Sequence, residues 1–388
     1  MDTQKLDQTY IANTYARFPV TIVKGKGSLV WDDTGKEYID LSTGIAVDIF
    51  GVADEEWMAA VTKQLGTLQH ISNLYYTEPC VKLAQMLCEK TGMKKVFFGN
   101  SGAEANECAI KAARKWSEEK KGKDYSTIIT LKNSFHGRTI TTLAATGQDV
   151  FHHDFTPLTE GFVYAEPNDL ADLEQLIKAN KCAAVMMEVV QGEGGVMPLD
   201  EAYVKGAAKL CEQYDLLLIC DEVQVGNGRS GKLYGYMHYG VQPDIVSTAK
   251  GLAGGLPLGA TLLGEKVQDV LSAGTHGSTF GGNPVCCAGA LSILHRLDGP
   301  LLQSVQEKSD FIVDTLTGAP GVKSVTGLGL MLGVETVRPA ADVICACAEQ
   351  GVLVISAKNK VRLLPALNIP MAQLEQAIGV LKAVCAEV

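Results

Sequence analysis

The chain has 388 residues, 46% of them hydrophobic, so it can bury a large core and hold more than one domain of about 150 residues each. Its formal net charge of -10 disfavours nonspecific binding to nucleic acid, which needs a basic surface. Small-molecule metabolites are therefore the expected partners, and nucleic acid is not.

The cysteines and the N-terminal segment bear on where the protein works. The eleven cysteines include no CxxC motif, so neither a disulfide framework nor a zinc ribbon is predicted, and no bound metal is expected. Residues 1–10 lack the apolar region of a signal peptide, and residues 251–264 are too short and glycine-rich to span a bilayer. The sequence predicts a soluble, unprocessed cytoplasmic protein without a membrane anchor.

Taken in chain order, the first elements are an arm and a small β structure. Residues up to about Arg17 are typical of an N-terminal helix or arm. Residues 20–39 alternate and turn as a β-meander does, with a strand, a turn and a strand at 31–38. The periodicity of residues 54–65 and 78–90 then predicts two helices.

From residue 95 onward the pattern alternates between strand and helix. The expected strands are 95–98, 126–131, 183–189 and 216–220, and the expected helices are 103–119, 170–179 and 202–214. This alternation predicts a mainly parallel sheet with helices on both faces. After about Pro284 a helix at 285–297 leads into shorter elements, which predicts a separate small domain.

Two reactive side chains follow apolar runs in the second half of the chain. Asp221 follows the run 216–220, and Lys250 closes a β-branched run and opens onto glycines. The carboxyl ends of parallel strands face the crevice where α/β folds bind ligands, so both side chains are expected to face one small molecule. A lysine held there can lose its proton and form a Schiff base, although most lysines after strands are simply solvated.

Residues 99–104 join a predicted strand to a predicted helix. The free N–H groups at a helix N-terminus bind phosphate well, which would place Ser101, Gly102 and Ala103 around an anion. The same residues also fit an ordinary capped helix, because Glu104 follows Ser101 by three positions. The local sequence leaves both interpretations open.

Residues 221–231, followed by Pro243-Asp244 and by Ala249-Lys250-Gly251, resemble the signature of the class III (ω-amino) aminotransferases. These enzymes use pyridoxal 5'-phosphate, and the sequence is most similar to their acetylornithine aminotransferase branch. The resemblance extends from Gly25 to Pro365. It implies an α/β protein of the aspartate aminotransferase-like fold type I, with a large domain built on a mainly parallel seven-stranded sheet and a smaller α+β domain.

The resemblance also suggests domain boundaries. Residues 1–45 would form an N-terminal arm and β-meander that belong to the small domain, 46–283 the large cofactor-binding domain, and 284–388 the C-terminal small domain.

The resemblance implies a role for each cofactor residue. Lys250 would hold pyridoxal 5'-phosphate, Asp221 would keep the pyridine nitrogen protonated, Phe135 would stack on the ring and Gln224 would bind the ring hydroxyl. Thr279 would reach the phosphate of the neighbouring subunit, which implies a homodimer with shared active sites. The full set of expected cofactor contacts is Ser101, Gly102, Ala103, Phe135, Glu188, Asp221, Val223, Gln224, Lys250 and Thr279.

The substrate contacts implied by the resemblance are Tyr15, Arg138, Glu193, Ser278 and Arg362. Arg138 would grip a substrate carboxylate, a task that suits its planar fork of donors, and Glu193 would pair with Arg362. The implied reaction moves the ω-amino group of N-acetylornithine to 2-oxoglutarate and gives N-acetylglutamate 5-semialdehyde and glutamate. It would belong to arginine biosynthesis.

Several alternatives remain open. The substrate could instead be ornithine, succinyl-diaminopimelate or 4-aminobutyrate, and the more distant alternatives are an aminomutase or a non-catalytic cofactor-binding protein. The chain also departs from the family pattern, with residues 51–55 where relatives carry Gly-His-x-His-Pro and Val225 in place of a threonine. His136 is interpreted as structural. The GxGxxG match at 226–231 is rejected as a dinucleotide motif, because no helix pattern follows it.

Overall fold

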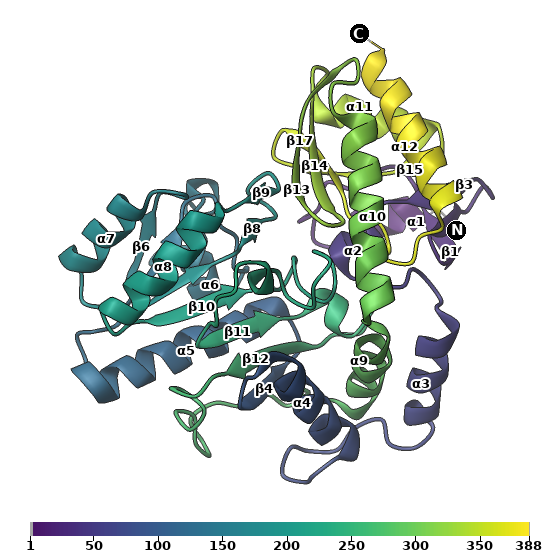
Figure 1. Cartoon of the computed structure of the whole chain (residues 1–388). Coiled ribbons are helices and arrows are strands. Elements are labelled where there is room, and N and C mark those ends of the chain that lie inside the picture. Colours follow the sequence, from purple (N-terminus) through teal and green to yellow (C-terminus); the bar gives the residue numbers. More distant parts are fainter. Residues whose placement is uncertain (1–2, 388) are drawn as a thin grey trace.

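The computed structural model describes residues 3–387, and its centre is a seven-stranded sheet in the order β4-β12-β11-β10-β7-β5-β6 (Figure 1). All its neighbours pair in parallel except β12, which runs antiparallel to β11 and β4. The predicted mainly parallel α/β sheet is therefore confirmed. The strands are β4 Lys95–Gly99, β5 Thr127–Leu131, β6 Phe162–Ala165, β7 Cys182–Met187, β10 Leu217–Asp221, β11 Ile245–Thr248 and β12 Gly259–Leu263.

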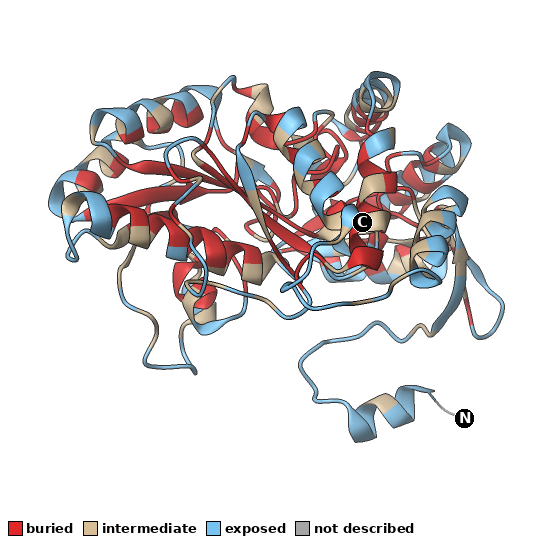
Figure 2. Ribbon diagram, turned by 90° about the horizontal axis from the view of Figure 1, so that it is seen from below, coloured by how far each residue is buried: buried red, intermediate tan, exposed pale blue. Residues whose placement is uncertain are grey.

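Helices cover both faces of this sheet, as the alternation predicted. Successive side chains on a strand point to opposite faces, so Ile219 packs with Ile110 of α5 (Gly102–Lys121), whereas Leu218 belongs to the core under α7 and α8. Figure 2 shows the buried strands between helices whose outer sides are exposed. The remaining helices of this region are α3 Glu55–Leu65, α4 Glu78–Thr91, α6 Ile140–Ala145, α7 Leu170–Ala179, α8 Glu201–Gln213 and α9 Pro284–Arg296.

Among the elements of this region that the sequence did not reveal are β6, β12 and α6. β6 has only four residues, and β12 begins with Gly259 and Ala260, which have little strand preference. The predicted strand 183–189 also ends earlier, at Met187, so Glu188 follows β7 directly.

Two four-stranded sheets form the smaller part of the molecule. One has the order β1-β2-β3-β15 and contains the predicted meander, and the other has the order β13-β14-β17-β16. Val352 of β15 pairs with Ile39 of β3, so the N-terminal and C-terminal segments share a sheet. The domain boundaries after residues 45 and 283 stay a prediction. The bounds are β1 Ile22–Lys26, β2 Leu29–Asp32, β3 Glu37–Asp40, β13 Val322–Leu328, β14 Met331–Thr336, β15 Val352–Leu353, β16 Ile355–Ala357, β17 Lys360–Leu363, α10 Gly299–Leu316, α11 Ala340–Glu349 and α12 Met371–Ala386.

The loop that departs from the family pattern has its own local interactions. Val52 exchanges two backbone hydrogen bonds with Gly27, at 2.7 and 2.8 Å, and Asp54 caps α3 by accepting from the N–H of Trp57 at 2.9 Å. Asp54 also pairs with Arg296 of α9 at 2.8 Å. These contacts fix the loop against α3 and α9.

A left-handed turn links the meander to the large sheet. Thr43, Gly44, Ile45 and Ala46 have φ values of 46°, 62°, 67° and 62°, a conformation that is costly for residues other than glycine. The Thr43 hydroxyl donates to the carbonyl of Leu364 at 2.6 Å and so ties this turn (α2, Thr43–Ala46) to the segment after β17.

Among residues 3–387 no single helix is long and apolar enough to cross a bilayer. In this described range one pair of helices, α9 and α10, reaches that length and composition when taken together, and a bend of 76° separates the two.

Candidate active site

Asp221 is the last residue of β10 and lies buried at the carboxyl end of that strand. One carboxylate oxygen accepts from the N–H of Val223 at 3.0 Å, and the other accepts from Asn106 Nδ2 and lies 2.8 Å from His136 Nδ1. Donors to both oxygens stabilise the negative charge of the carboxylate.

His136 and Asn106 are site residues that the sequence analysis missed, since it treated His136 as structural. Both are buried, and each has one side-chain atom, His136 Nε2 or Asn106 Oδ1, for which residues 3–387 supply no hydrogen-bond partner. A signal for Asn106 was available, because it is a polar residue on the apolar face of a predicted helix, between Ala105 and Cys108.

Lys250 follows β11 and opens the short turn η3 (Lys250–Leu252). The residue as a whole is partly buried, but desolvation of its amine lowers the pKa of Lys250, and the charges of Glu193 and Arg362 act in opposite directions on it. Its φ of 48° is unusual for a residue with a side chain, and such strain clusters at functional sites. Asn227 supports the turn by donating to the carbonyl of Ala249 at 3.1 Å.

Glu188 follows β7 and lies buried beside the same cluster. Its carboxylate accepts from the N–H groups of Phe135 at 2.8 Å and Gly192 at 3.3 Å. Burial raises the pKa of Glu188 to about 7, an effect that the His136 charge opposes and the Asp221 charge reinforces. Glu188 thus fixes the backbone of Phe135, the residue predicted to stack on the cofactor ring.

The N-terminus of α5 lies at the same edge of the sheet. Ser101 is its N-cap, because Ser101 Oγ accepts from the N–H of Glu104 at 3.2 Å. The capping interpretation is therefore confirmed for the Ser101 hydroxyl. Helix geometry leaves the N–H groups of Gly102 and Ala103 without a partner inside the helix, free for an anion. A Cβ on Gly102 would lie 2.6 Å from Val223 Cγ1, so glycine allows the helix to approach the segment after Asp221.

A second charged group approaches Lys250 from β17. Arg362 Nη1 lies 2.5 Å from Glu193 Oε1 and donates to Gln224 Oε1 at 2.9 Å, while Gln224 Nε2 donates to Glu193 at 3.3 Å. Burial tends to raise the pKa of Glu193, but the charge and hydrogen bond of Arg362, with the Lys250 charge and the Gln224 hydrogen bond, lower that pKa overall. The structure therefore brings together Arg362, Glu193 and Gln224, and the charges of Glu193 and Arg362 both act on the Lys250 amine.

Arg138 lies at the rim of the site, on an exposed segment before α6. Its guanidinium is 5.4 Å from the ring centre of Phe135 and 4.2 Å from that of Phe151, so it stacks on two aromatic rings.

Three predicted substrate or cofactor contacts lie outside the group of residues around Asp221 and Lys250, namely Tyr15, Ser278 and Thr279. Tyr15 is 70% exposed on the N-terminal arm, which stands away from the rest of the chain in Figure 2. Ser278 Oγ accepts from Asn100 Nδ2 at 3.1 Å, in an open hollow of about 440 Å³, and Thr279 lies exposed on its edge.

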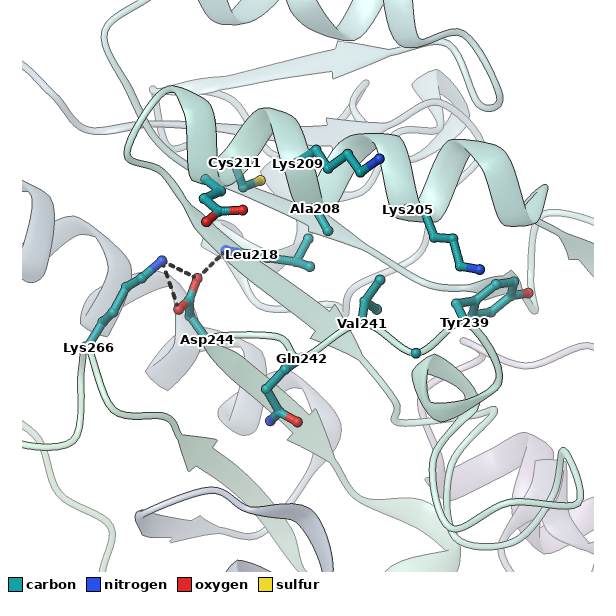
Figure 3. A pocket seen from close by; sticks show the side chains of 12 residues that line it. Lys205, Ala208, Lys209, Cys211, Leu218, Tyr239, Val241, Gln242, Asp244 and Lys266 are labelled. Carbon is teal, nitrogen blue, oxygen red and sulfur yellow. Dashed lines mark hydrogen bonds and ion pairs between the residues drawn. The ribbon is translucent and has the colours of Figure 1, made fainter.

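A separate cleft of about 550 Å³ lies at the opposite, amino-terminal ends of β10 and β11 (Figure 3). Asp244 there pairs with Lys266 at 3.1 Å and accepts from the N–H of Leu218 at 3.0 Å. None of the predicted site residues lines this cleft.

Comparisons with known proteins agree with this geometry. The sequence model of the class III aminotransferases matches residues 10–385. The chain is 51% identical over 386 residues to the acetylornithine aminotransferase of Haemophilus ducreyi, covering 99% of this chain and 98% of that protein. It is 42% identical over 389 residues to the acetylornithine aminotransferase of Methanocaldococcus jannaschii, with 99% and 98% covered.

Solved structures give the same result. The N-acetylornithine aminotransferase of Stenotrophomonas maltophilia has a TM-score of 0.86 at 36% identity, with 98% of both chains covered. An ornithine aminotransferase of Toxoplasma gondii, described with pyridoxal phosphate partially occupying its active site, has a TM-score of 0.95 at 34% identity and covers 99% of this chain and 94% of its own. The fold and the site define an aminotransferase. Within that class of enzyme, the chain belongs to the class III family.

The cofactor that this family implies is pyridoxal 5'-phosphate, and the residues present fit it. The group needs an amine, a carboxylate for its ring nitrogen and an anion site for its phosphate. The structure supplies the desolvated amine of Lys250, the buried carboxylate of Asp221 and the free N–H groups at Gly102 and Ala103. These groups come from three separate elements that meet at one edge of the sheet.

Proposed function

We propose that this enzyme transfers the ω-amino group of N-acetylornithine to 2-oxoglutarate, giving N-acetylglutamate 5-semialdehyde and glutamate. The observation that carries the proposal is the buried arginine Arg362, held by Glu193 at 2.5 Å and electrostatically coupled to Lys250. A site that accepts a neutral acylamino end in one half-reaction and a second carboxylate in the other needs an arginine whose charge can be masked and released. The names of the relatives support the same substrate.

In this proposal residues from several elements would hold the cofactor. Gly102 and Ala103 would bind its phosphate, Phe135 would stack on its ring, Asp221 would bind its ring nitrogen and Lys250 would anchor it. When bound, pyridoxal 5'-phosphate supplies an electron sink for the charge that develops at the substrate carbon. The other expected cofactor contacts are Ser101, Glu188, Val223, Gln224 and, from a second subunit, Thr279.

Lys250 and Asp221 divide the chemical work. The lowered pKa of Lys250 makes a neutral amine accessible, so Lys250 can take a proton from the substrate carbon and return it. Both carboxylate oxygens of Asp221 accept hydrogen bonds, which fix the carboxylate in place. His136 orients that carboxylate through its 2.8 Å contact.

Two arginines bind the carboxylates of the substrates in this proposal. Arg138 holds the carboxylate that both substrates share, and Arg362 takes the second carboxylate of 2-oxoglutarate once Glu193 has released it. While Glu193 stays paired, the charge of Arg362 is neutralised and an acylated amine can occupy the pocket.

A homodimer completes the site. Exposed apolar side chains gather on one loop, where Leu74 is 88%, Tyr75 65% and Tyr76 99% exposed. Asn73 ties this loop to the Ser278–Gly281 segment by donating to both of its end carbonyls, at 3.0 and 2.9 Å. Covering this surface with a second copy would bury it and bring Thr279 to the partner's phosphate site. Light scattering measures the oligomeric state of the wild type and of Tyr76→Glu. The wild type is expected to be dimeric and the variant monomeric.

A cytoplasmic location stays a prediction.

The substrate is tested with a panel. The purified enzyme is given 2-oxoglutarate with N-acetylornithine, ornithine, succinyl-diaminopimelate or 4-aminobutyrate, and kcat/KM is measured for each. N-acetylornithine is expected to lead. A higher kcat/KM for ornithine or 4-aminobutyrate would transfer the proposal to that substrate.

The arginine switch has its own test. In Glu193→Gln the acid that masks Arg362 is lost, so the half-reaction with N-acetylornithine should slow by about tenfold relative to the half-reaction with glutamate, a difference of ~1.4 kcal/mol. Single-turnover kinetics of the two half-reactions measure the ratio. An equal effect on both would rule the switch out.

A further inference from the structure

Arg229 is a buried cation that the mechanism above does not use. It is 0% exposed, in the segment that follows β10, and within residues 3–387 it has no ion pair with a carboxylate. Burial lowers the pKa of Arg229 to about 9, and its Nε and Nη2 atoms find no hydrogen-bond partner in the described part of the chain. Burying a charge without an ion pair lowers the stability of the folded state, which suggests that the contacts of Arg229 serve a function.

The contacts of Arg229 join the two parts of the molecule. Its Nη1 donates to the carbonyl of Leu330 at 3.2 Å and to the carbonyl of Pro365, and its own carbonyl accepts from the N–H of Leu330 at 2.9 Å. Gly329 makes this approach possible, because a Cβ there would lie 2.6 Å from the carbonyl oxygen of Arg229.

The two carbonyls belong to the ends of one strand pair. Leu330 immediately precedes β14, and Pro365 lies just beyond the end of β17. These strands are antiparallel neighbours, and Gly333 of β14 lies opposite Arg362 of β17. One guanidinium therefore holds both strands at the end next to Arg362, and it does so from the segment that also carries Gln224, the second partner of Arg362.

We propose that Arg229 is a positioning residue that sets the place of Arg362 against Glu193 and Gln224, and thereby the affinity for the second carboxylate of the oxo acid. The inference rests on the proposed role of Arg362. An arginine suits this position, because its forked donors can reach two carbonyls from one buried point.

Lys308 provides a matched control. It too is a buried cation that donates to a carbonyl after β17, that of Leu367 at 2.5 Å, but it reaches only this one carbonyl and comes from α10. A general loosening of the segment would follow from the loss of either cation, whereas a displacement of Arg362 should follow only from the loss of Arg229.

The experiment measures binding to the holoenzyme by titration calorimetry. Glutarate serves as an unreactive dicarboxylate and pentanoate as the matching monocarboxylate. In Arg229→Met the Kd of glutarate is expected to rise by at least about tenfold, or ~1.4 kcal/mol, with the Kd of pentanoate within about twofold of wild type. Lys308→Met should lower the melting temperature and leave the ratio of the two Kd values within about twofold of wild type.

A double variant shows whether Arg229 acts through Arg362. Arg229→Met added to Arg362→Gln should weaken glutarate binding no further than Arg362→Gln does. Additive losses, or an equal change of the Kd ratio in Lys308→Met, would overturn the inference. If Arg362→Gln binds glutarate as wild type does, the proposed role of Arg362 fails instead, and the inference fails with it.

Arg229→Lys covers the case in which the methionine variant does not fold. One amine can reach one of the two carbonyls, so glutarate binding should lie between wild type and Arg362→Gln, with an unchanged circular dichroism spectrum. Wild-type affinity for glutarate in a folded Arg229→Lys would overturn the requirement for two tethered strands.

Discussion

The two ends of β10 and β11 carry the same residue types in different surroundings. At the carboxyl ends lie Asp221 and Lys250, and at the amino ends lies Asp244, with Lys266 beside it (Figure 3). Each end carries one aspartate and one lysine, although Lys266 follows β12 and Lys250 follows β11. Only the first end is proposed as the aminotransferase site.

The difference between the ends is the partner of each lysine. Lys266 has a side chain 45% exposed and pairs directly with Asp244 at 3.1 Å, so its charge is both solvated and neutralised. Asp221 instead takes its hydrogen bonds from Val223, Asn106 and His136. Lys250 is desolvated, forms no direct ion pair with any residue that the structure describes, and has a lowered pKa. We attribute the reactivity of the Lys250 amine to its burial without a carboxylate as a direct ion-pair partner.

The largest difference in kcat between the two ends is expected when each lysine is replaced. Lys250→Ala is expected to lower kcat by at least about 10³-fold, or ~4 kcal/mol, because the amine that moves the proton is gone. Lys266→Ala should leave kcat unchanged. Steady-state assays of both variants, with cofactor content measured by absorbance, test this. Comparable losses of kcat in the two variants would remove the distinction between the ends.

The aspartates should show the same contrast with a smaller effect. Asp221→Asn is expected to lower kcat by about 10²-fold, or ~2.7 kcal/mol, because an amide cannot stabilise a positive charge on the cofactor ring. Asp244→Asn keeps an oxygen for the N–H of Leu218 and should retain wild-type kcat. Near-normal turnover in Asp221→Asn would contradict the role given to its charge.

The sequence predicted which residues lie at the ends of strands better than it predicted the side chains that contact those residues. An apolar run followed by a charged residue marks a carboxyl end, so the residue pattern alone is enough to place Asp221 and Lys250 at one edge of the sheet. His136 could not be assigned, because its contact with Asp221 joins residues far apart in the chain, and no local pattern reports such a contact.

The contacts between the seven-stranded sheet region and the smaller sheets show the same limit. The Glu193–Arg362 pair could be expected only from the family resemblance, because residues that far apart meet through the tertiary fold. Arg229 gave no signal as a tether, since an arginine in a glycine-rich segment usually lies on the surface. Its burial depends on the segments around Leu330 and Pro365 closing over it.

The desolvation of Lys250 can be measured through the pH dependence of stability. Because the folded pKa of Lys250 is lowered below its ordinary value near 10.5, the unfolded chain binds more protons between these two pKa values. The apoprotein should therefore become more stable as pH rises through that window, and Lys250→Met should lose this gain. Thermal melts of both apoproteins from pH 7 to pH 10 give the difference. Parallel curves would show that the amine is not desolvated.

The smallest effect is expected at the amino ends of the strands, from Lys266→Met. A half-exposed ion pair is worth at most ~1 kcal/mol, because water screens the charges and the long side chain loses entropy when it is held. Asp244 keeps the N–H of Leu218 as a donor at 3.0 Å, so losing the lysine does not leave its carboxylate without a partner. The free energy of unfolding, from urea titration, should fall by less than ~1 kcal/mol, and the difference from wild type should shrink in 1 M salt, where the Debye length is about 3 Å. A loss of ~3 kcal/mol that salt does not reduce would mean that Asp244 is as desolvated as a buried active-site charge. In that case the contrast between the two ends would depend on the donors around Asp221 and not on exposure to water.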